Sequence, residues 1–341
     1  MKGFEVFFDS LYLTFVLFIG IRLLFVRKED SGLIGTMVLL LGLGDSFHLI
    51  PRIISNVAPG GFAANADALF FGTRVSAWTM SLFYLLFYYY IRREARVRFR
   101  MLDVAMPLLF VFRMAIVLLS FSRSYRVDLI SNIPFLLMGL IDFILLYRER
   151  DRVQFGRLYL YVLFSFLFYV PVVLLKNVYP SIGMLMMPKT IMYVLMVWKL
   201  YGNLKDTFDV SDLVCGAGTY LMYGVLAGAF YREVGKIYPV EPSLAFLHVH
   251  LIVLGFVLPT LFYLLVKEHS FENRCLKNLS ILYNFGMFFS FGSMFLHGLL
   301  DGYTLQALVR VGMVSMSGVG HILLTIAFIK GAAMGLKAVE I

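Results

Sequence analysis

The sequence has few charged residues. Only 15% of its 341 residues are Asp, Glu, Lys or Arg, whereas 60% are hydrophobic. Soluble domains carry about a quarter charged and about half apolar residues, so this composition excludes an ordinary soluble domain. Cysteine is also scarce, because Cys215 and Cys275 are the only two. Without a Cys-x-x-Cys pair or a framework of several cysteines, the sequence predicts neither a disulfide nor a thiolate metal site.

Familiar catalytic motifs are missing. There is no Walker loop, no Gly-x-Ser-x-Gly elbow, no His-Glu-x-x-His pair and no kinase segment. The net charge of +9 does not indicate a nucleic-acid partner, because the basic residues lie between apolar blocks and no nucleic-acid module is recognisable. The expected partner is instead the lipid bilayer, with its anionic headgroups. A membrane-embedded enzyme stays open as a hypothesis, although no nucleophile or acid–base set is apparent.

What the sequence has in abundance is apolar blocks of about twenty residues, each long enough to cross a bilayer. These blocks predict an all-α fold, a polytopic integral membrane bundle of about eleven transmembrane helices. The expected spans are approximately residues 6–25, 33–55, 67–91, 101–121, 129–147, 158–177, 183–202, 211–231, 244–266, 279–299 and 309–333.

The basic clusters fall in alternate loops. They lie at residues 27–28, in "RREARVRFR" (92–100), in "RERDRVQFGR" (148–157), at Lys205 and at residues 267–277. Because basic loops stay cytoplasmic, the N-terminus is expected outside and the C-terminus in the cytoplasm. We expect the protein to lie in the cell membrane, as a multi-pass protein of the bacterial cytoplasmic membrane.

A polar stretch, "YGNLKDTFDVSD" at residues 201–212, divides the chain. It predicts a seven-helix membrane domain over residues 1–205 and a four-helix membrane domain over residues 206–341. The two parts differ in their polar residues: the first carries charged residues inside its spans, and the second carries histidines and glycines.

In the seven-helix part, Asp45, His48 and Arg52 recur at i, i+3 and i+7 on one helical stripe. Ionisable residues inside a membrane are functional candidates because they are costly to bury. One hypothesis is a pocket, open to the outside, for a small polar or anionic ligand of a transporter or receptor-like protein. The alternative is a structural network of Asp45, His48 and Arg113. The predicted pocket residues are Asp45, His48, Arg52, Arg74, Trp78, Arg113 and Lys189.

In the four-helix part, "SLAFLHVHLIVLG" (243–255) carries His248 and His250, and the next span ends at His297. Two imidazoles from facing helices, at one height and beside small residues, are the axial ligands that a b-type haem needs. We predict His248 and His297 for this role, with His250 as the substitute for His248. The haem would serve electron transfer, with a redox partner, or haem handling.

Two further residues complete this hypothesis, and two alternatives stay open. His321 lies near mid-membrane, and Arg310 is placed to neutralise haem propionates. A bound metal at His248, His250 and His297 is one alternative. In the other, each histidine only forms a hydrogen bond to a neighbouring helix.

Residues 210–335 carry a family resemblance. The segments "LHVHLIVLG", "LYNFGMFFSFGSMFLHG" and "GVGHILL" resemble a bacterial four-span membrane family of uncharacterised function. They are also loosely similar to histidine-bearing helices of haem–copper oxidase subunit I. The resemblance implies that His248, His250, His297 and His321 are the characteristic polar residues. It does not imply oxygen reduction, because there are too few spans and histidines for two haems and copper.

Overall fold

The computed structural model describes residues 2–26, 28–58, 60–96, 98–119, 125–175, 177–204, 210–236, 240–269, 271–300 and 307–339. Within them every regular element is a helix. The helices are α1 (Lys2–Leu24), α2 (Ser31–Val57), α3 (Gly61–Ala64), α4 (Ala66–Ala95), α5 (Arg100–Leu119), α6 (Tyr125–Arg148), α7 (Leu158–Leu175), η1 (Pro180–Leu185), α8 (Met186–Leu204), α9 (Ser211–Val234), α10 (Pro242–His250), η2 (Leu251–Val257), α11 (Leu258–Val266), α12 (Asn273–Leu300) and α13 (Ala307–Val339).

Each expected span is helical. Ten helical segments of the described chain are long and apolar enough to cross a membrane. The third expected span, 67–91, forms the long helix α4 but is not one of these ten. The span expected at 244–266 is one rod in which η2 is a π-helical stretch between α10 and α11. The wider π-helical turn lies just before Pro259. It accommodates the proline, which lacks an N–H and whose ring would clash with a preceding α-helical turn.

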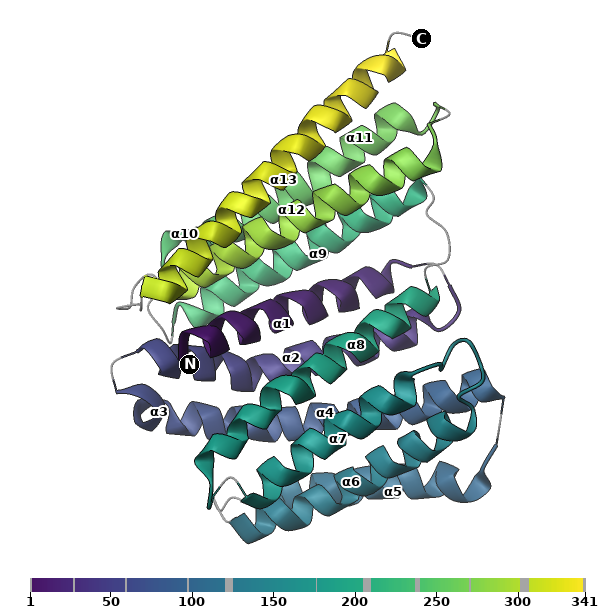
Figure 1. Ribbon diagram of the computed structural model, residues 1–341, viewed down its shortest axis with the longest axis vertical. Helices are drawn as coiled ribbons and strands as arrows, with labels where there is room; N and C mark the ends of the chain where they lie inside the picture. The colour runs from purple at the N-terminus through teal and green to yellow at the C-terminus, as the bar shows by residue number, and fades with distance from the viewer. Residues whose placement is uncertain are drawn as a thin grey trace. The chain divides into compact units, whose positions relative to one another are not determined.

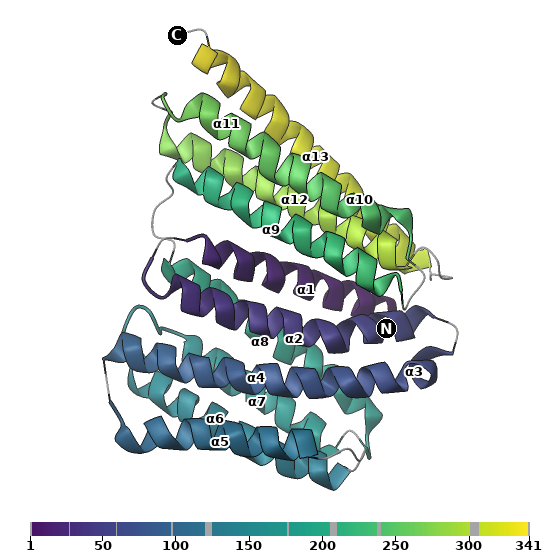
Figure 2. The same cartoon turned by 180° about the vertical axis from the view of Figure 1, so that it is seen from behind.

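The described helices pack as two compact units. Unit 1 comprises residues 1–27, 50–66 and 205–341, and unit 2 comprises residues 28–49 and 67–204. The first helix, α1, therefore packs with the last four spans, against α9, α12 and α13 (Figures 1 and 2). Arg22 of α1 is buried and lies against Gly216 of α9, where a Cβ atom would stand 2.4 Å from Arg22 Nη1. A larger residue than glycine would force the end of the Arg22 side chain to shift.

Unit 1 is held together by close contacts at small residues. Gly286 of α12 lies against Leu324 of α13, and Gly320 of α13 lies against Ser290 of α12. Ser293 Oγ donates a hydrogen bond to the Met313 carbonyl at 3.1 Å. Small residues allow two helix backbones to approach closely, which is how helices associate in lipid. Gly286, Ser290 and Ser293 of α12 thus lie on the surface that α13 covers.

Unit 2 has an aromatic core and two distinct ends. Helices α5, α6, α7 and α8 lie side by side in sequence order (Figure 1). Within this unit the ring of Tyr84 of α4 packs against the rings of Phe135 and Phe166, with 5.3 Å between ring centres in each pair. At one end, Tyr125 Oη donates to the Leu174 carbonyl at 2.9 Å. The other end, which we call the basic end, is formed by residues 28–30, 92–96, 98–99 and 148–157.

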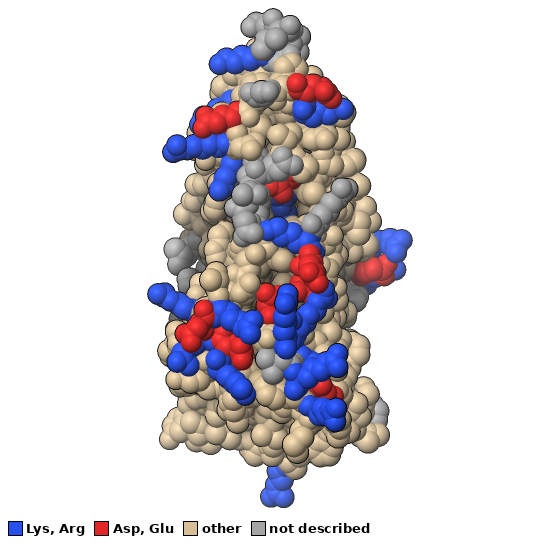
Figure 3. Space-filling view, turned by 90° about the vertical axis from the view of Figure 1, so that its right-hand side faces the viewer, with Lys and Arg blue, Asp and Glu red and all other residues tan. Residues whose placement is uncertain are grey.

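Contacts between loops define the basic end. Arg152 Nη2 donates to the Ala95 carbonyl at 3.1 Å. Arg93 pairs with Glu29 at 2.7 Å and with Asp30 at 2.9 Å. Figure 3 shows a face on which lysine and arginine gather together with acidic side chains in patches. Loops expected on one side of the membrane therefore lie together in this unit. Arg27 and Lys205, expected on the same side, lie outside the described residues.

Candidate functional site

A buried arginine lies within unit 2. Arg113 of α5 is 2% exposed, and Nη2 is 3.4 Å from Asn132 Oδ1 of α6. The guanidinium carbon lies 4.1 Å from the centre of the Phe135 ring. Nε and Nη1 are buried without an acceptor, and no carboxylate pairs with Arg113 within the described residues. The guanidinium carries most of the hydrogen-bond donors of the site, and two of its three nitrogens have no acceptor among the described residues.

A second cation belongs to the same cluster. Lys189 of α8 places its ammonium 4.6 Å from the Tyr169 ring centre and 5.4 Å from that of Tyr193. It also interacts electrostatically with Arg113 and with Asp45. Tyr169 Oη donates to Asn132 Oδ1 at 2.7 Å, so α5, α6, α7 and α8 all contribute to one cluster. We call Arg113, Asn132, Tyr169 and Lys189 the cationic cluster.

Two acids border the cationic cluster. Asp45 of α2 accepts a hydrogen bond from Ser76 of α4 at 2.7 Å. Asp128, one turn before Asn132 on α6, is exposed and interacts electrostatically with Tyr169. Asp45, which is half-buried, therefore accepts a hydrogen bond from a serine, and Asp128 is at the surface. The interior of the cluster carries more positive than negative charge.

The other residues of the predicted pocket lie elsewhere. Arg52 belongs to unit 1, where it pairs with Glu5 and lies 4.0 Å from Asp9, both of α1. Arg74 donates to the Val117 carbonyl at the end of α5 and lies 5.0 Å from the Phe70 ring centre. The remaining two residues are on α2 and α4: His48 is half-buried, and Trp78 is 44% exposed.

The Arg52 pairing gives a testable result. Replacing Arg52 by methionine leaves Glu5 and Asp9 partly buried without their cation, so unit 1 should lose about 1 kcal/mol of unfolding free energy. The matched control is Arg232→Met, because the Arg232–Glu233 pair at 2.8 Å is exposed and such pairs contribute little. Thermal unfolding of the two variants should separate them. Equal effects would show that the Arg52 pairing does not stabilise unit 1.

Several residues of this site were not predicted. Asparagine and tyrosine are common in membrane helices, so no signal in the sequence marks Asn132, Tyr169 and Tyr193. Only their contacts in the structure place them in the site. Asp142, which is fully buried in α6, did have a signal. It is the single acid in the apolar run "LMGLIDFILL", and a lone carboxyl in a membrane span is a functional candidate.

The described contacts of His248, His250 and His321 in unit 1 are with their own helix or with the neighbouring helix α9. His250 and His321 are exposed, and each Nδ1 contacts the carbonyl four residues earlier, at 2.9 and 2.7 Å. His248 is half-buried beside Gly228 of α9, and its Nδ1 has no partner within the described residues. His297 is half-buried near the end of α12. Arg310 is exposed on α13.

Glycines near the predicted haem ligands lie against neighbouring helices. Helices α10 and α12 do pack together, but Leu244, Leu247 and Leu251 are buried in a shared apolar core with α12 residues. Gly224 and Gly298 lie against α10 itself. No group of three His, Cys, Asp or Glu side chains able to hold a metal occurs in the described part of the chain. Haem or metal binding at these histidines therefore stays a prediction from the sequence.

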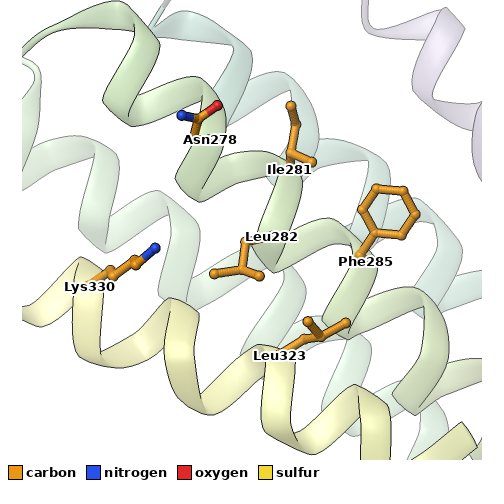
Figure 4. A pocket seen from close by; sticks show the side chains of 6 residues that line it. All are labelled: Asn278, Ile281, Leu282, Phe285, Leu323 and Lys330. Atoms are coloured by element: carbon orange, nitrogen blue, oxygen red, sulfur yellow. The ribbon is translucent and has the colours of Figure 1, made fainter.

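Unit 1 also has an open groove between α12 and α13, with a volume of about 370 Å³ (Figure 4). Its walls are apolar except for Asn278 and Lys330, which lie together at one end of the groove. None of the predicted histidines lines it. The lining residues are Asn278, Ile281, Leu282, Phe285, Leu323 and Lys330.

The ten apolar helices are those of a multi-pass helical membrane protein, and the cationic cluster is its most unusual interior feature. Residues 211–336 match a family model described as "Protein of unknown function (DUF2871)". This match covers the last four spans, lies within unit 1 and leaves all of unit 2 unmatched. No curated protein and no solved structure matches the chain.

Proposed function

We propose that this multi-pass membrane protein binds a small anionic ligand at the cationic cluster, as a transporter or a receptor-like protein. The ligand would be a carboxylate, phosphate or sulfate, whose oxygens accept the hydrogen bonds that Arg113 Nε and Nη1 do not make. Lys189 would supply a second positive charge. This proposal takes the place of haem-linked electron transfer as the main hypothesis, because it is supported by the contacts of the cluster.

The observation that carries the proposal is the burial of Arg113 without a carboxylate partner among the described residues. An arginine at the centre of a membrane span costs about 2.5–3.5 kcal/mol on the insertion scale. The ring of Phe135 offsets part of this cost, because a cation over an aromatic ring gains about 0.5–2 kcal/mol. A bound anion would offset the remainder.

We further propose that about eleven helices cross the membrane, with α4 among them, the N-terminus outside and the C-terminus in the cytoplasm. The support is that loops rich in arginine meet at the basic end of unit 2, as the positive-inside rule requires. Arg113 lies six residues before the end of α5 that is opposite the basic end. A ligand would then approach the cluster from the outside.

The test is thermal unfolding of the full-length protein in lipid nanodiscs with formate, acetate, nitrate, sulfate or phosphate, each matched to sodium chloride of equal ionic strength. Trp78 and Trp198 are the two tryptophans of the sequence, and both lie in unit 2, so their fluorescence reports that unit. An anion at ten times its Kd should stabilise unit 2 by about 1.4 kcal/mol.

Arg113→Gln should abolish this stabilisation, whereas the matched control Arg74→Gln should retain it, because Arg74 donates to a backbone carbonyl. Cys215 and Cys275 lie in unit 1, so thiol labelling of Cys215 in a Cys275→Ser background reports that unit separately. Its labelling should not respond to the anion. The proposal fails if no anion stabilises the wild type, or if the stabilisation persists in Arg113→Gln.

A further inference from the structure

A second ionisable group in unit 2 lies apart from the cationic cluster. Asp142 of α6 is 0% exposed, and both carboxylate oxygens lack a hydrogen-bond partner within the described residues. It lies six residues before the end of α6 at the basic end. A carboxylate without a cation or donor is far more costly to bury than the neutral acid. A proton is the smallest partner that removes this cost.

Polar side chains connect Asp142 with the cationic cluster. Tyr84 of α4 interacts electrostatically with Asp142. Its hydroxyl lies 3.1 Å from Tyr193 Oη and 3.4 Å from Ser165 Oγ. The ring of Tyr193 in turn lies 5.4 Å from Lys189 Nζ. A line of buried polar groups therefore runs through the aromatic core of unit 2, from Lys189 to Asp142.

The other charged groups near α6 have partners of their own. On α5, Asp103 pairs with Arg92 at 3.0 Å and accepts a hydrogen bond from Tyr88 at 2.7 Å. On α7, Tyr159 contacts the ring of Tyr147. Arg113 of α5 and Tyr169 of α7 both contact Asn132, which precedes Asp142 by ten residues on α6. Tyr84 is thus the titratable group whose electrostatic interaction with the Asp142 carboxylate is described.

We propose that Asp142 is a proton-binding site that is coupled to the anion at the cationic cluster, so that anion and proton bind together. This inference rests on the proposed function for the anion, but the proton site itself does not. Anion binding raises the fraction of Asp142 that is protonated, and the added proton comes from water and returns to it when the anion dissociates, so no other reactant is needed. The ligand would then be taken up, or sensed, together with a proton.

The size of the coupling follows from the separation. Ten helical residues between Asn132 and Asp142 span about 15 Å. For two single negative charges at about 15 Å, with an effective dielectric constant of about 20, Coulomb's law gives a coupling of about sixfold in affinity. Anion affinity should therefore fall about sixfold as the pH rises through the titration of Asp142.

The first experiment needs no anion. Infrared spectra of the full-length protein in nanodiscs should contain the C=O stretch of a protonated carboxyl, and Asp142→Asn should remove it. Asp103→Asn is the matched control and should leave the band in place, because Asp103 is paired with Arg92. The proton site is refuted if the band is absent at every pH or survives in Asp142→Asn. It is also refuted if sodium ions stabilise the wild type but not Asp142→Asn, since the carboxylate would then hold a metal cation.

The second experiment measures the affinity for formate and sulfate, which keep their charge from mildly acidic to mildly alkaline pH. From mildly acidic to mildly alkaline pH, the affinity of the wild type should fall about sixfold more for formate than that of Asp142→Asn does, and by a larger factor for sulfate. An identical pH dependence in both proteins overturns the coupling. If neither anion binds, the proposed function fails, and the infrared result still decides the proton site. Asp142→Glu, which should restore the band and the pH dependence, serves if the asparagine variant does not fold.

Discussion

Replacing Arg113 by methionine is expected to make the ligand-free protein more stable, by about 2 kcal/mol of unfolding free energy for unit 2. The variant no longer buries a guanidinium, whose insertion costs about 2.5–3.5 kcal/mol. It loses the contact with Phe135 and the long hydrogen bond to Asn132, which together return part of that gain. Methionine is flexible and apolar, so it can fill the space that the arginine side chain leaves.

The measurement is denaturant-dependent unfolding in bicelles, followed by tryptophan fluorescence. Arg74→Met is the matched control and should change stability in the opposite direction, because the carbonyl of Val117 loses its donor. Residues selected for binding commonly reduce stability. This pair of variants therefore tests whether Arg113 serves ligand binding or the stability of unit 2. If Arg113→Met is the more destabilised of the two, Arg113 is a structural link between α5 and α6 and the binding proposal loses its basis.

Replacing Gly320 by leucine is expected to destabilise unit 1 by at least about 3 kcal/mol. A Cβ at this position would stand 2.4 Å from Ser290 Oγ and 2.6 Å from the Ser290 backbone nitrogen. The backbone of α12 cannot move aside as a side chain can, so α12 and α13 must separate along their interface. Much of the apolar core of unit 1 lies between these helices.

Gly318 provides the matched control, because it lies two residues earlier on the same helix and a Cβ there would meet nothing within 4 Å. Gly318→Leu should be neutral or should gain up to about 0.8 kcal/mol from helix propensity. Labelling of Cys215 during thermal unfolding, in the Cys275→Ser background, measures both variants. If the two leucine variants unfold at the same temperature, the close packing of α12 on α13 is not what stabilises unit 1.

The helices themselves could be predicted from the sequence. The span expected at 33–55 is α2, Ser31–Val57, and the one expected at 101–121 is α5, Arg100–Leu119. Such agreement is local in origin, because backbone groups in lipid must bond within their own helix and a bilayer fixes the length of an apolar run. Arg113 and Lys189 could be singled out for the same reason, since a charge inside an apolar run is conspicuous.

The side chains that these residues contact could not be predicted from the sequence in this way. The stripe of Asp45, His48 and Arg52 is regular in sequence, but in the structure Arg52 pairs with Glu5 of α1 while Asp45 accepts from Ser76 of α4. The rotation of each helix and the choice of its neighbours depend on packing against other helices, which periodicity along one helix does not specify.

Composition and the spacing of apolar runs alone determined that this chain forms membrane-length helices, because the requirement for satisfied backbone groups acts within each helix. Only the tertiary structure decided that α1 packs with the last four spans, that α13 covers the small residues of α12, and that Asp142 is buried without a hydrogen-bond partner within the described residues. These outcomes depend on contacts between segments far apart in the chain, where close packing selects one arrangement among many that hydropathy allows equally.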